Sequence, residues 1–292
     1  MDTLVIPNFK FENLMMSNEK FIKLLLQNNA RIGNLPDKDL AQQFIDDIFQ
    51  FLFIPKTGIN QKETDLEKGL YALKSHLATL IYDVVNDGGK SQMQADAFFE
   101  ALPGLYAALQ KDAEAFVAND PAALNISQIL QTYPGFYAIA VYRISNQLRR
   151  QDIRGLPRIF AEYAHSKTGI DIHPHATIGS HFFIDHGTGV VIGETSIIGN
   201  NVRMYQGVTI GALNSAKTKK QAKRHPSIED NVIIYSGATI LGNITVGHDT
   251  VIGGNAWVTF DVPANSLVYN QSEVADKDTF SHKDSVSKIF KK

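Results

Sequence analysis

The first half of the chain shows a helical pattern of apolar residues. From the N-terminus to about residue 165, apolar positions recur at spacings of three and four, with Lys, Gln, Asp and Glu between them. The predicted helices span 17–28, 37–53, 64–85, 105–118, 135–150 and 157–167. Because no strand pattern separates these runs, we predict an all-α bundle.

Residues that disfavour helices divide these runs. Glycine and proline recur between the apolar segments, and Pro103-Gly104 is expected to separate two helices. The other breaks fall at 32–36, Gly58, Gly88-Gly89, Pro121 and Pro134-Gly135.

From Asp171 onward the apolar period changes to six. One aliphatic side chain recurs in each hexad, and a small residue or glycine often follows. The hexad positions are Ile172, Ile178, Ile184, Ile192, Ile198, Met204, Ile210, Ile228, Ile234, Ile240, Val246, Ile252, Val258 and Ala264. This repeat is typical of a parallel β-helix with three short strands in each coil of about 18 residues. We therefore predict a helical domain over 1–168, a β-helix over 169–268 and a tail over 269–292.

Two interruptions of the hexad repeat are candidates for function. The segment 184–189 is two residues too long, and it is expected to push Asp185 and His186 out of the coil wall. The second interruption, 212–226, is a long polar loop, and such loops in a compact repeat usually carry function. Its charged residues are Lys217, Lys219, Lys220, Lys223, Arg224 and His225.

Composition narrows the possible classes of protein. The 292 residues are 44% hydrophobic and 20% charged, which suits a packed core, and the net charge of −2 gives no general attraction to nucleic acid or an anionic membrane. There is no cysteine, so disulfides, thiolate metal sites and a cysteine nucleophile are excluded. The chain shows neither a signal peptide at its start nor a run of about 18 apolar residues, so we expect a soluble, cytoplasmic protein.

Short strings in both halves carry a family resemblance. They are Asp171-Ile172-His173-Pro174, Ile184-Asp185-His186-Gly187-Thr188-Gly189, Gly193-Glu194-Thr195, Gly207-Val208-Thr209-Ile210-Gly211, Arg224-His225-Pro226, Asn119-Asp120-Pro121-Ala122, Tyr133-Pro134-Gly135-Phe136 and Tyr142-Arg143. Through them, residues from about 115 to 265 resemble the serine O-acetyltransferases of the hexapeptide-repeat acyltransferase superfamily. The resemblance implies a left-handed β-helix and transfer of acetyl from acetyl-CoA to the L-serine hydroxyl, giving O-acetyl-L-serine for cysteine biosynthesis.

The resemblance also implies roles for the catalytic residues. A serine hydroxyl is a weak nucleophile and needs a base, and histidine is the residue type whose ordinary pKa lies near neutral pH, so His186 is the candidate. Asp171, fifteen positions earlier, is similar to the family's partner carboxylate, which orients that imidazole. The hydroxyl would then attack the thioester directly, without a covalent enzyme intermediate.

Other residues are implied to bind the two substrates. Asp120, next to Pro121, and Asp185 would bind the serine ammonium group, while Arg224 and His225 would face its carboxylate and hydroxyl end. The coenzyme, acting as cosubstrate with no metal, is implied to contact small residues between subunits. These residues are Gly211, Ala212, Ser236, Ala238 and Gly254.

The resemblance further implies assembly and regulation. Relatives form trimers and often pair them into hexamers through the helical domain, and L-cysteine is implied as a feedback inhibitor because it is nearly isosteric with serine. A terminal isoleucine of the family can enter O-acetylserine sulfhydrylase. Because this chain ends in Lys291-Lys292, we predict that the sulfhydrylase complex is weak or absent.

Three alternatives stay open at this point. Another hexapeptide acetyltransferase, acting on a sugar or an antibiotic, would keep the histidine but usually lacks the helical half. A γ-class carbonic anhydrase would use three histidines to bind zinc on the same fold, and His181 and His186 have a compatible spacing. A non-catalytic relative is disfavoured because Asp171, His186 and Arg224 are all present. The chain departs from the family at Ala212, where relatives often carry glycine.

Overall fold

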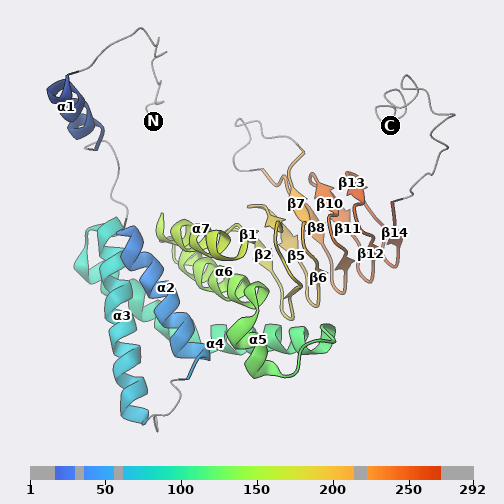
Figure 1. Ribbon diagram of the computed structural model, residues 1–292, viewed down its shortest axis with the longest axis horizontal. Coiled ribbons are helices and arrows are strands. Elements are labelled where there is room, and N and C mark those ends of the chain that lie inside the picture. The colour runs from blue at the N-terminus through green and yellow to red at the C-terminus, as the bar shows by residue number, and fades with distance from the viewer. Residues whose placement is uncertain (1–16, 30–35, 56–61, 214–221, 271–292) are drawn as a thin grey trace. The chain divides into compact units, whose positions relative to one another are not determined.

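The computed structural model describes residues 17–29, 36–55, 62–213 and 222–270 (Figure 1). The chain divides into two units, 1–35 and 36–292, and helix α1 (Asn18–Asn29) belongs to the first. None of the described helices is long and apolar enough to cross a lipid bilayer. The predicted boundary at residue 168 stays a prediction, because the remaining helices and the coils pack together within the second unit.

Six described helices open the second unit. They are α2 (Lys38–Phe53), α3 (Glu63–Val85), α4 (Gly88–Asn119), α5 (Ile126–Thr132), α6 (Pro134–Arg150) and α7 (Leu156–Thr168). Asp37 caps α2, since its side chain accepts hydrogen bonds from the backbone N–H groups of Asp39 and Leu40. Proline at the second position of α7 suits a helix start, where its missing N–H has no partner to lose.

The prediction of a break at Pro103-Gly104 is wrong. Helix α4 runs unbroken from Gly88 to Asn119 with Pro103 inside it, so the predicted helix 105–118 is only its second half. Proline removes one helical hydrogen bond, but apolar residues are buried on both sides of it. Tertiary packing of Phe98 and Leu102 before the proline, and of Leu109 and Phe116 after it, therefore outweighs the local penalty. The seven-residue helix α5 was not predicted, because it is too short to show a period.

In the described part of the chain, fourteen short parallel strands follow, arranged in three sheets. Sheet 1 contains β1 (Asp171–Ile172), β4 (Val191–Ile192), β7 (Thr209–Gly211), β10 (Thr239–Leu241) and β13 (Trp257–Val258). Sheet 2 contains β2 (Thr177–Ile178), β5 (Ile197–Ile198), β8 (Ser227–Ile228) and β11 (Thr245–Val246). Sheet 3 contains β3 (Phe183–Ile184), β6 (Arg203–Met204), β9 (Ile233–Ile234), β12 (Val251–Ile252) and β14 (Leu267–Val268). Every third strand thus returns to the same sheet up to β13, whereas β14 joins sheet 3 two strands after β12.

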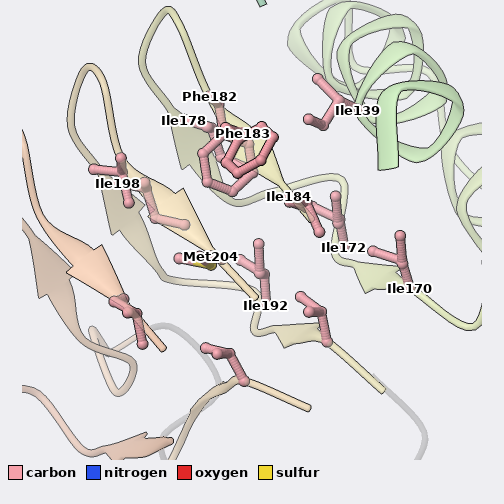
Figure 2. Packing of buried hydrophobic residues seen from close by; sticks show 14 of the residues in the cluster. Ile139, Ile170, Ile172, Ile178, Phe182, Phe183, Ile184, Ile192, Ile198 and Met204 are labelled. Carbon is pink, nitrogen blue, oxygen red and sulfur yellow. The ribbon is translucent and has the colours of Figure 1, made fainter. Parts of the chain in front are cut away.

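The predicted hexad residues form columns inside the coils. Ile172 pairs with Ile192, and Ile192 with Ile210, in sheet 1, and sheets 2 and 3 repeat this register. Figure 2 shows the column from sheet 3, with Ile184 beside Met204, and the aromatic rings of Phe182 and Phe183 above them. The hexads up to Val258 are 8% exposed or less, as a β-helix core requires.

The prediction that Ala264 is the last inward residue of the hexad repeat is wrong. Val262 bridges to Val246 and is 4% exposed, so it takes the inward place in sheet 2, whereas Ala264 is only partly buried. The turn after Val258 is two residues shorter than a full hexad, and Val268 then resumes the column by pairing with Ile252. A small side chain at 264 therefore marks a corner and not a strand.

The turns between sheets form three corners of the prism. We call the turn from sheet 1 to sheet 2 the first corner, which contains 173–176, 193–196 and 212–226. The second corner leads from sheet 2 to sheet 3 and contains 179–182. The third corner leads from sheet 3 back to sheet 1 and contains 185–190, 205–208, 235–238 and 253–256.

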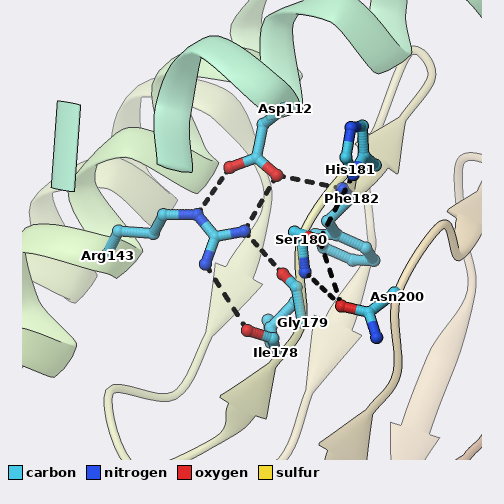
Figure 3. Close-up of polar contacts among 8 residues, drawn as sticks. All are labelled: Asp112, Arg143, Ile178, Gly179, Ser180, His181, Phe182 and Asn200. Carbon is cyan, nitrogen blue, oxygen red and sulfur yellow. Dashed lines mark hydrogen bonds and ion pairs between the residues drawn. The ribbon is translucent and has the colours of Figure 1, made fainter. Parts of the chain in front are cut away.

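A buried ion pair fastens the helices to the second corner of the first coil (Figure 3). Arg143 of α6 donates two hydrogen bonds to Asp112 of α4, which is fully buried, and a third to the Gly179 carbonyl at 2.7 Å. Oδ1 of Asp112, which accepts from Nη2 of Arg143, also accepts from the backbone N–H of Phe182 at 3.0 Å. Burial raises the pKa of the Asp112 carboxyl, and the Arg143 guanidinium opposes that rise. These contacts hold the segment that leads directly into β3 and the third corner.

Candidate active site

The first interruption of the repeat is a bulge at the third corner. Ile172 pairs with Ile192 twenty positions later, whereas Ile192 pairs with Ile210 eighteen positions later, so the two extra residues lie between β3 and β4. The Gly187 backbone has φ +81°, and a Cβ there would lie 2.4 Å from Cδ1 of Ile170. Only glycine fits this turn, which leaves His186 projecting from it with φ +56°.

Among the described residues, the His186 imidazole pairs with one charged side chain, that of Asp185. Its Nε2 lies 3.5 Å from Oδ2 of Asp185, and its side chain is 71% exposed while that of Asp185 is 17% exposed. Asp171 lies at the start of β1 in sheet 1. Among the described residues it makes no hydrogen bond or ion pair with His186, so its predicted role in orienting the imidazole stays a prediction.

Asp120 is held beside this corner by the end of α4. Its Oδ2 accepts a hydrogen bond from the Tyr133 hydroxyl at 2.6 Å, and its Oδ1 accepts from the backbone N–H of Ala122 at 2.8 Å. The hydrogen bond to Asp120, together with burial and the charges of Asp120 and Asp185, raises the pKa of Tyr133 to about 12. The charge of Asp185 thus acts on the same hydroxyl that Asp120 binds. Pro121 follows in an exposed turn.

Aromatic rings support the two carboxylates. Phe116 lies edge-on to Phe183, with ring centroids 4.9 Å apart, and edge-on to Tyr133 at 5.8 Å. Along the third corner, the rings of Tyr205 and Tyr235 stack at 5.2 Å. Our sequence reasoning missed both tyrosines. A signal was present, because Asp185, Tyr205 and Tyr235 each follow the inward hexad residue of a successive sheet 3 strand.

A second group of predicted residues lies at the first corner. Arg224 forms an ion pair with Glu194, and His225 is 7% exposed. The backbone N–H of Thr195 donates to Nδ1 of His225 at 3.1 Å, and the Thr195 Oγ1 accepts from the backbone N–H groups of Arg224 and His225. Because Nδ1 accepts, the neutral ring of His225 carries its proton on Nε2. Burial and the Arg224 charge lower the pKa of His225.

Gly193 makes room for the His225 ring. A Cβ at Gly193 would lie 2.1 Å from Cδ2 of that ring, well inside any permitted contact. The Gly193-Glu194-Thr195 string therefore has one purpose in each position. The glycine clears space, Glu194 binds Arg224, and Thr195 fixes His225.

The structure divides the remaining predicted site residues between these two corners. Ser236 and Gly254 lie on the third corner with His186, whereas Gly211 ends β7 and Ala212 begins the loop at the first corner. Ala238 is fully buried, backbone included, so its predicted contact with the coenzyme stays a prediction. Lys217, Lys219 and Lys220 lie outside the described residues, and Lys223 donates to the His225 carbonyl.

The histidine pair considered for zinc is not brought together within one chain. His181 lies at the second corner, where its Nδ1 contacts Ser180, and His186 lies at the third. Among the described residues, the one group of three side chains with ligand atoms close enough to share a metal is His173, His175 and Glu194 at the first corner.

Comparison with known proteins agrees with this arrangement. Residues 225–259 match the model of the bacterial transferase hexapeptide (six repeats) family. The chain is 54% identical to the plasmid serine acetyltransferase of Synechococcus elongatus over 178 residues, which are 59% of this chain and 56% of that protein. It is 46% identical to the serine acetyltransferase of Bacillus subtilis over 160 residues, which are 55% of this chain and 72% of that protein.

Solved structures extend the similarity into the helical half. Serine acetyltransferase 1 of Entamoeba histolytica, solved in complex with L-cysteine, superposes with a TM-score of 0.72 and 38% identity, covering 82% of this chain and 88% of that one. The predicted fold class, an all-α domain followed by a left-handed parallel β-helix of hexapeptide repeats, is confirmed. The chain belongs to the serine acetyltransferase family.

Proposed function

We propose that this chain transfers acetyl from acetyl-CoA to the hydroxyl of L-serine, giving O-acetyl-L-serine for cysteine biosynthesis. One observation carries the proposal beyond family membership. The bulge at the third corner projects a histidine, His186, beside the Asp185 carboxylate, and the charge of Asp185 also acts on the Tyr133 hydroxyl that Asp120 binds. The two carboxylates suit a substrate ammonium group. An acceptor with an amine near its hydroxyl fits that arrangement better than a sugar does.

His186 acts as the general base of the proposed reaction. It removes the hydroxyl proton as the serine oxygen attacks the thioester carbonyl carbon, and the C–S bond breaks when the tetrahedral intermediate collapses. The coenzyme thiolate leaves and takes up the proton from the imidazolium, so no covalent enzyme intermediate forms. Asp185 lies 3.5 Å from the imidazole, and Asp171 is proposed to orient the ring once substrate is bound.

Opposite charges bind the two ends of the serine zwitterion. The carboxylates of Asp120, held by Tyr133, and Asp185 attract the ammonium group. Arg224 binds the substrate carboxylate, for which a guanidinium is well shaped, and His225 offers its Nε2–H as a second donor. In the free chain Glu194 occupies Arg224, so substrate binding requires Arg224 to exchange or share that partner.

The proposed site takes its two halves from two chains. Asp185 and His186 lie at the third corner of the prism, and Arg224 and His225 lie at the first corner, so a flat sheet separates them within one chain. We call the interface between the third corner of one copy and the first corner of the next a seam. Each seam brings the two halves of the site together, and three copies joined by three seams form a closed ring. The coenzyme then lies in the same seam, where Ser236 and Gly254 of one copy face Gly211 and Ala212 of its neighbour. Pairing of such trimers through the helical half is part of the same proposal.

Thiol release from acetyl-CoA tests the reaction. The purified chain is assayed with L-serine, L-homoserine, sugars and no acceptor. Release with L-serine and suppression by L-cysteine are expected, since L-cysteine differs from the substrate in one atom and is the ligand of the solved Entamoeba histolytica relative. Release with another acceptor only would keep the family and the histidine but overturn the substrate. Added O-acetylserine sulfhydrylase is expected to bind weakly or not at all.

A further inference from the structure

A separate cavity of about 890 Å³ lies between the helices and the first corner of the first two coils. Its walls come from the end of α3, the start of α4, the connection between α6 and α7, and the residues His173, His175 and Glu194. None of the residues assigned above to serine or to the coenzyme lines it. The serine and coenzyme assignments therefore leave this cavity without an assigned ligand.

The walls of this cavity are rich in cations. Four lining residues are Lys or Arg and two are Asp or Glu, namely Lys90, Arg149, Arg154, Arg158, Asp152 and Glu194. Glu194 is already bound by Arg224, which lies outside the lining. The cavity consequently carries an excess of positive charge that the surrounding carboxylates do not neutralise.

Several of these cations have no protein partner. Among the described residues, the side chains of Lys90, Arg149 and Arg154 take part in no hydrogen bond or ion pair, and Nε of Arg149 is buried without a partner. A buried guanidinium nitrogen without a hydrogen bond is costly, so native proteins usually satisfy such groups with a ligand or water. Arg158 pairs only with the neighbouring exposed Glu162. Several unpaired cationic side chains in one cavity are typical of an anion-binding site.

The hydrogen bond between the two histidines at the cavity, and the neutral state of the His173 ring, favour an anion over a metal ion as the ligand. The backbone N–H of His175 donates to Nδ1 of His173 at 3.1 Å, so the neutral His173 ring has its proton on Nε2 and presents a donor. Burial, and then the Arg158 charge, lower the pKa of His173 to about 4, which keeps the ring neutral at pH 7. A metal would need the lone pair that the Nε2 proton occupies, and the third candidate ligand, Glu194, is bound to Arg224.

We propose that this cavity binds a multiply charged phosphate-bearing anion. Guanidinium groups match phosphate oxygens in pairs, and the cavity is lined by Arg149 in the last turn of α6 and by Arg154 in the α6–α7 connection. Helix α7 begins at Leu156 without a side-chain cap, so its positive end adds to the field. The phosphate has two possible sources, a free phosphorylated metabolite or the phosphates of the coenzyme.

Calorimetric titration of the full chain with pyrophosphate tests the shared chemistry. The cavity variant Lys90→Gln/Arg154→Gln is compared with Lys111→Gln/Arg150→Gln, which removes two exposed cations outside the lining. Saturable binding at constant ionic strength is expected for the wild type and the control, with at least tenfold weaker binding in the cavity variant. No saturable binding to the wild type, or equal weakening in both variants, would overturn the proposal.

A kinetic comparison separates the two sources, and this arm rests on the proposed function. KM is measured for acetyl-CoA and for its 3′-dephospho form in the same variants. A rise for acetyl-CoA alone in the cavity variant identifies the coenzyme's 3′-phosphate as the ligand. Unchanged KM values, with pyrophosphate binding still lost, identify a free phosphate ligand. If the chain turns over no serine, the pyrophosphate titration still decides whether the anion site exists.

Discussion

The third and first corners each present a histidine to the proposed site, and they hold it in opposite ways. His186 projects from a bulge, is 71% exposed, and pairs, among the described residues, with one charged side chain, that of Asp185. His225 is 7% exposed, its Nδ1 accepts from the Thr195 backbone, and Gly193 clears space for its ring. A group that exchanges protons with substrate must stay accessible, whereas a group that positions substrate should be fixed before binding. The difference in packing thus follows the proposed difference in role.

Replacing the exposed histidine should have the largest effect. His186→Ala is expected to lower kcat by about 10²–10⁴-fold, the range that general bases usually contribute. Circular dichroism and thermal unfolding should be unchanged, since the side chain packs against little. His181→Ala is a matched control, because His181 also has φ +56° but lies at the second corner. Equal loss in both variants, or an unchanged rate in His186→Ala, would contradict the assignment.

Mixing two inactive chains tests whether the corners cooperate between copies. His186→Ala and Arg224→Ala are each expected to be inactive as pure oligomers. After joint refolding, some seams would pair an intact third corner with an intact first corner, and roughly a quarter of wild-type activity is expected for random mixing of independent seams. If the mixture is no more active than either variant alone, each site takes both of its corners from a single chain.

Crowding the fixed histidine should have the next largest effect. Gly193→Ala places a Cβ 2.1 Å from the His225 ring, so the ring must move. The KM for L-serine is expected to rise by about tenfold or more, equivalent to about 1.4 kcal/mol, with a smaller change for acetyl-CoA. Gly104→Ala provides a control, because nothing lies near the added methyl group. Equal rises for both substrates would indicate general misfolding of the coil.

The hexad period predicted the core well because one inward aliphatic per strand is a strict local requirement of the β-helix. It placed Ile172 through Val258 correctly and failed at Ala264, where a turn shortened by two residues moved the inward position to Val262. The predicted helix break at Pro103 was wrong for the opposite reason, since tertiary packing overrode a local preference. Period alone therefore describes strands better than the turns and helices around them.

The candidate site was only partly predictable. His186 and Asp185 stood out because the bulge breaks the repeat, but the partners of the first corner depend on contacts thirty positions apart, such as Thr195 with His225. Tyr205 and Tyr235 were missed because each looks like an ordinary turn residue alone. They become a stacked pair only when successive coils are aligned.

Removing one hydroxyl should give a smaller change at the third corner. Tyr133→Phe deletes the hydrogen bond to Asp120 but keeps the ring against Phe116. The serine KM is expected to rise roughly fivefold, as for the loss of about 1 kcal/mol, while kcat changes little because His186 is untouched. Tyr163→Phe, which loses a hydroxyl bonded to Asp46 away from the third corner, is the matched control. A fall in kcat with unchanged KM would place Tyr133 in the chemical step instead.

The smallest expected effect concerns acid stability of the first corner. The pKa of His173 is lowered to about 4 in the folded chain by burial and by Arg158, whereas an unfolded histidine titrates near 6.5. Between these values the unfolded chain binds more protons, so stability is lost as the pH falls from about 6.5 towards about 4. His173→Gln should flatten this part of the unfolding free-energy profile, measured by urea denaturation at pH 7 and pH 5, and His175→Gln, the exposed neighbour, should not.

Saturating pyrophosphate should also flatten the wild-type profile, because an anion in the cavity favours the protonated ring. An identical slope in His173→Gln and the wild type would show that the acid sensitivity of the molecule arises elsewhere than at His173.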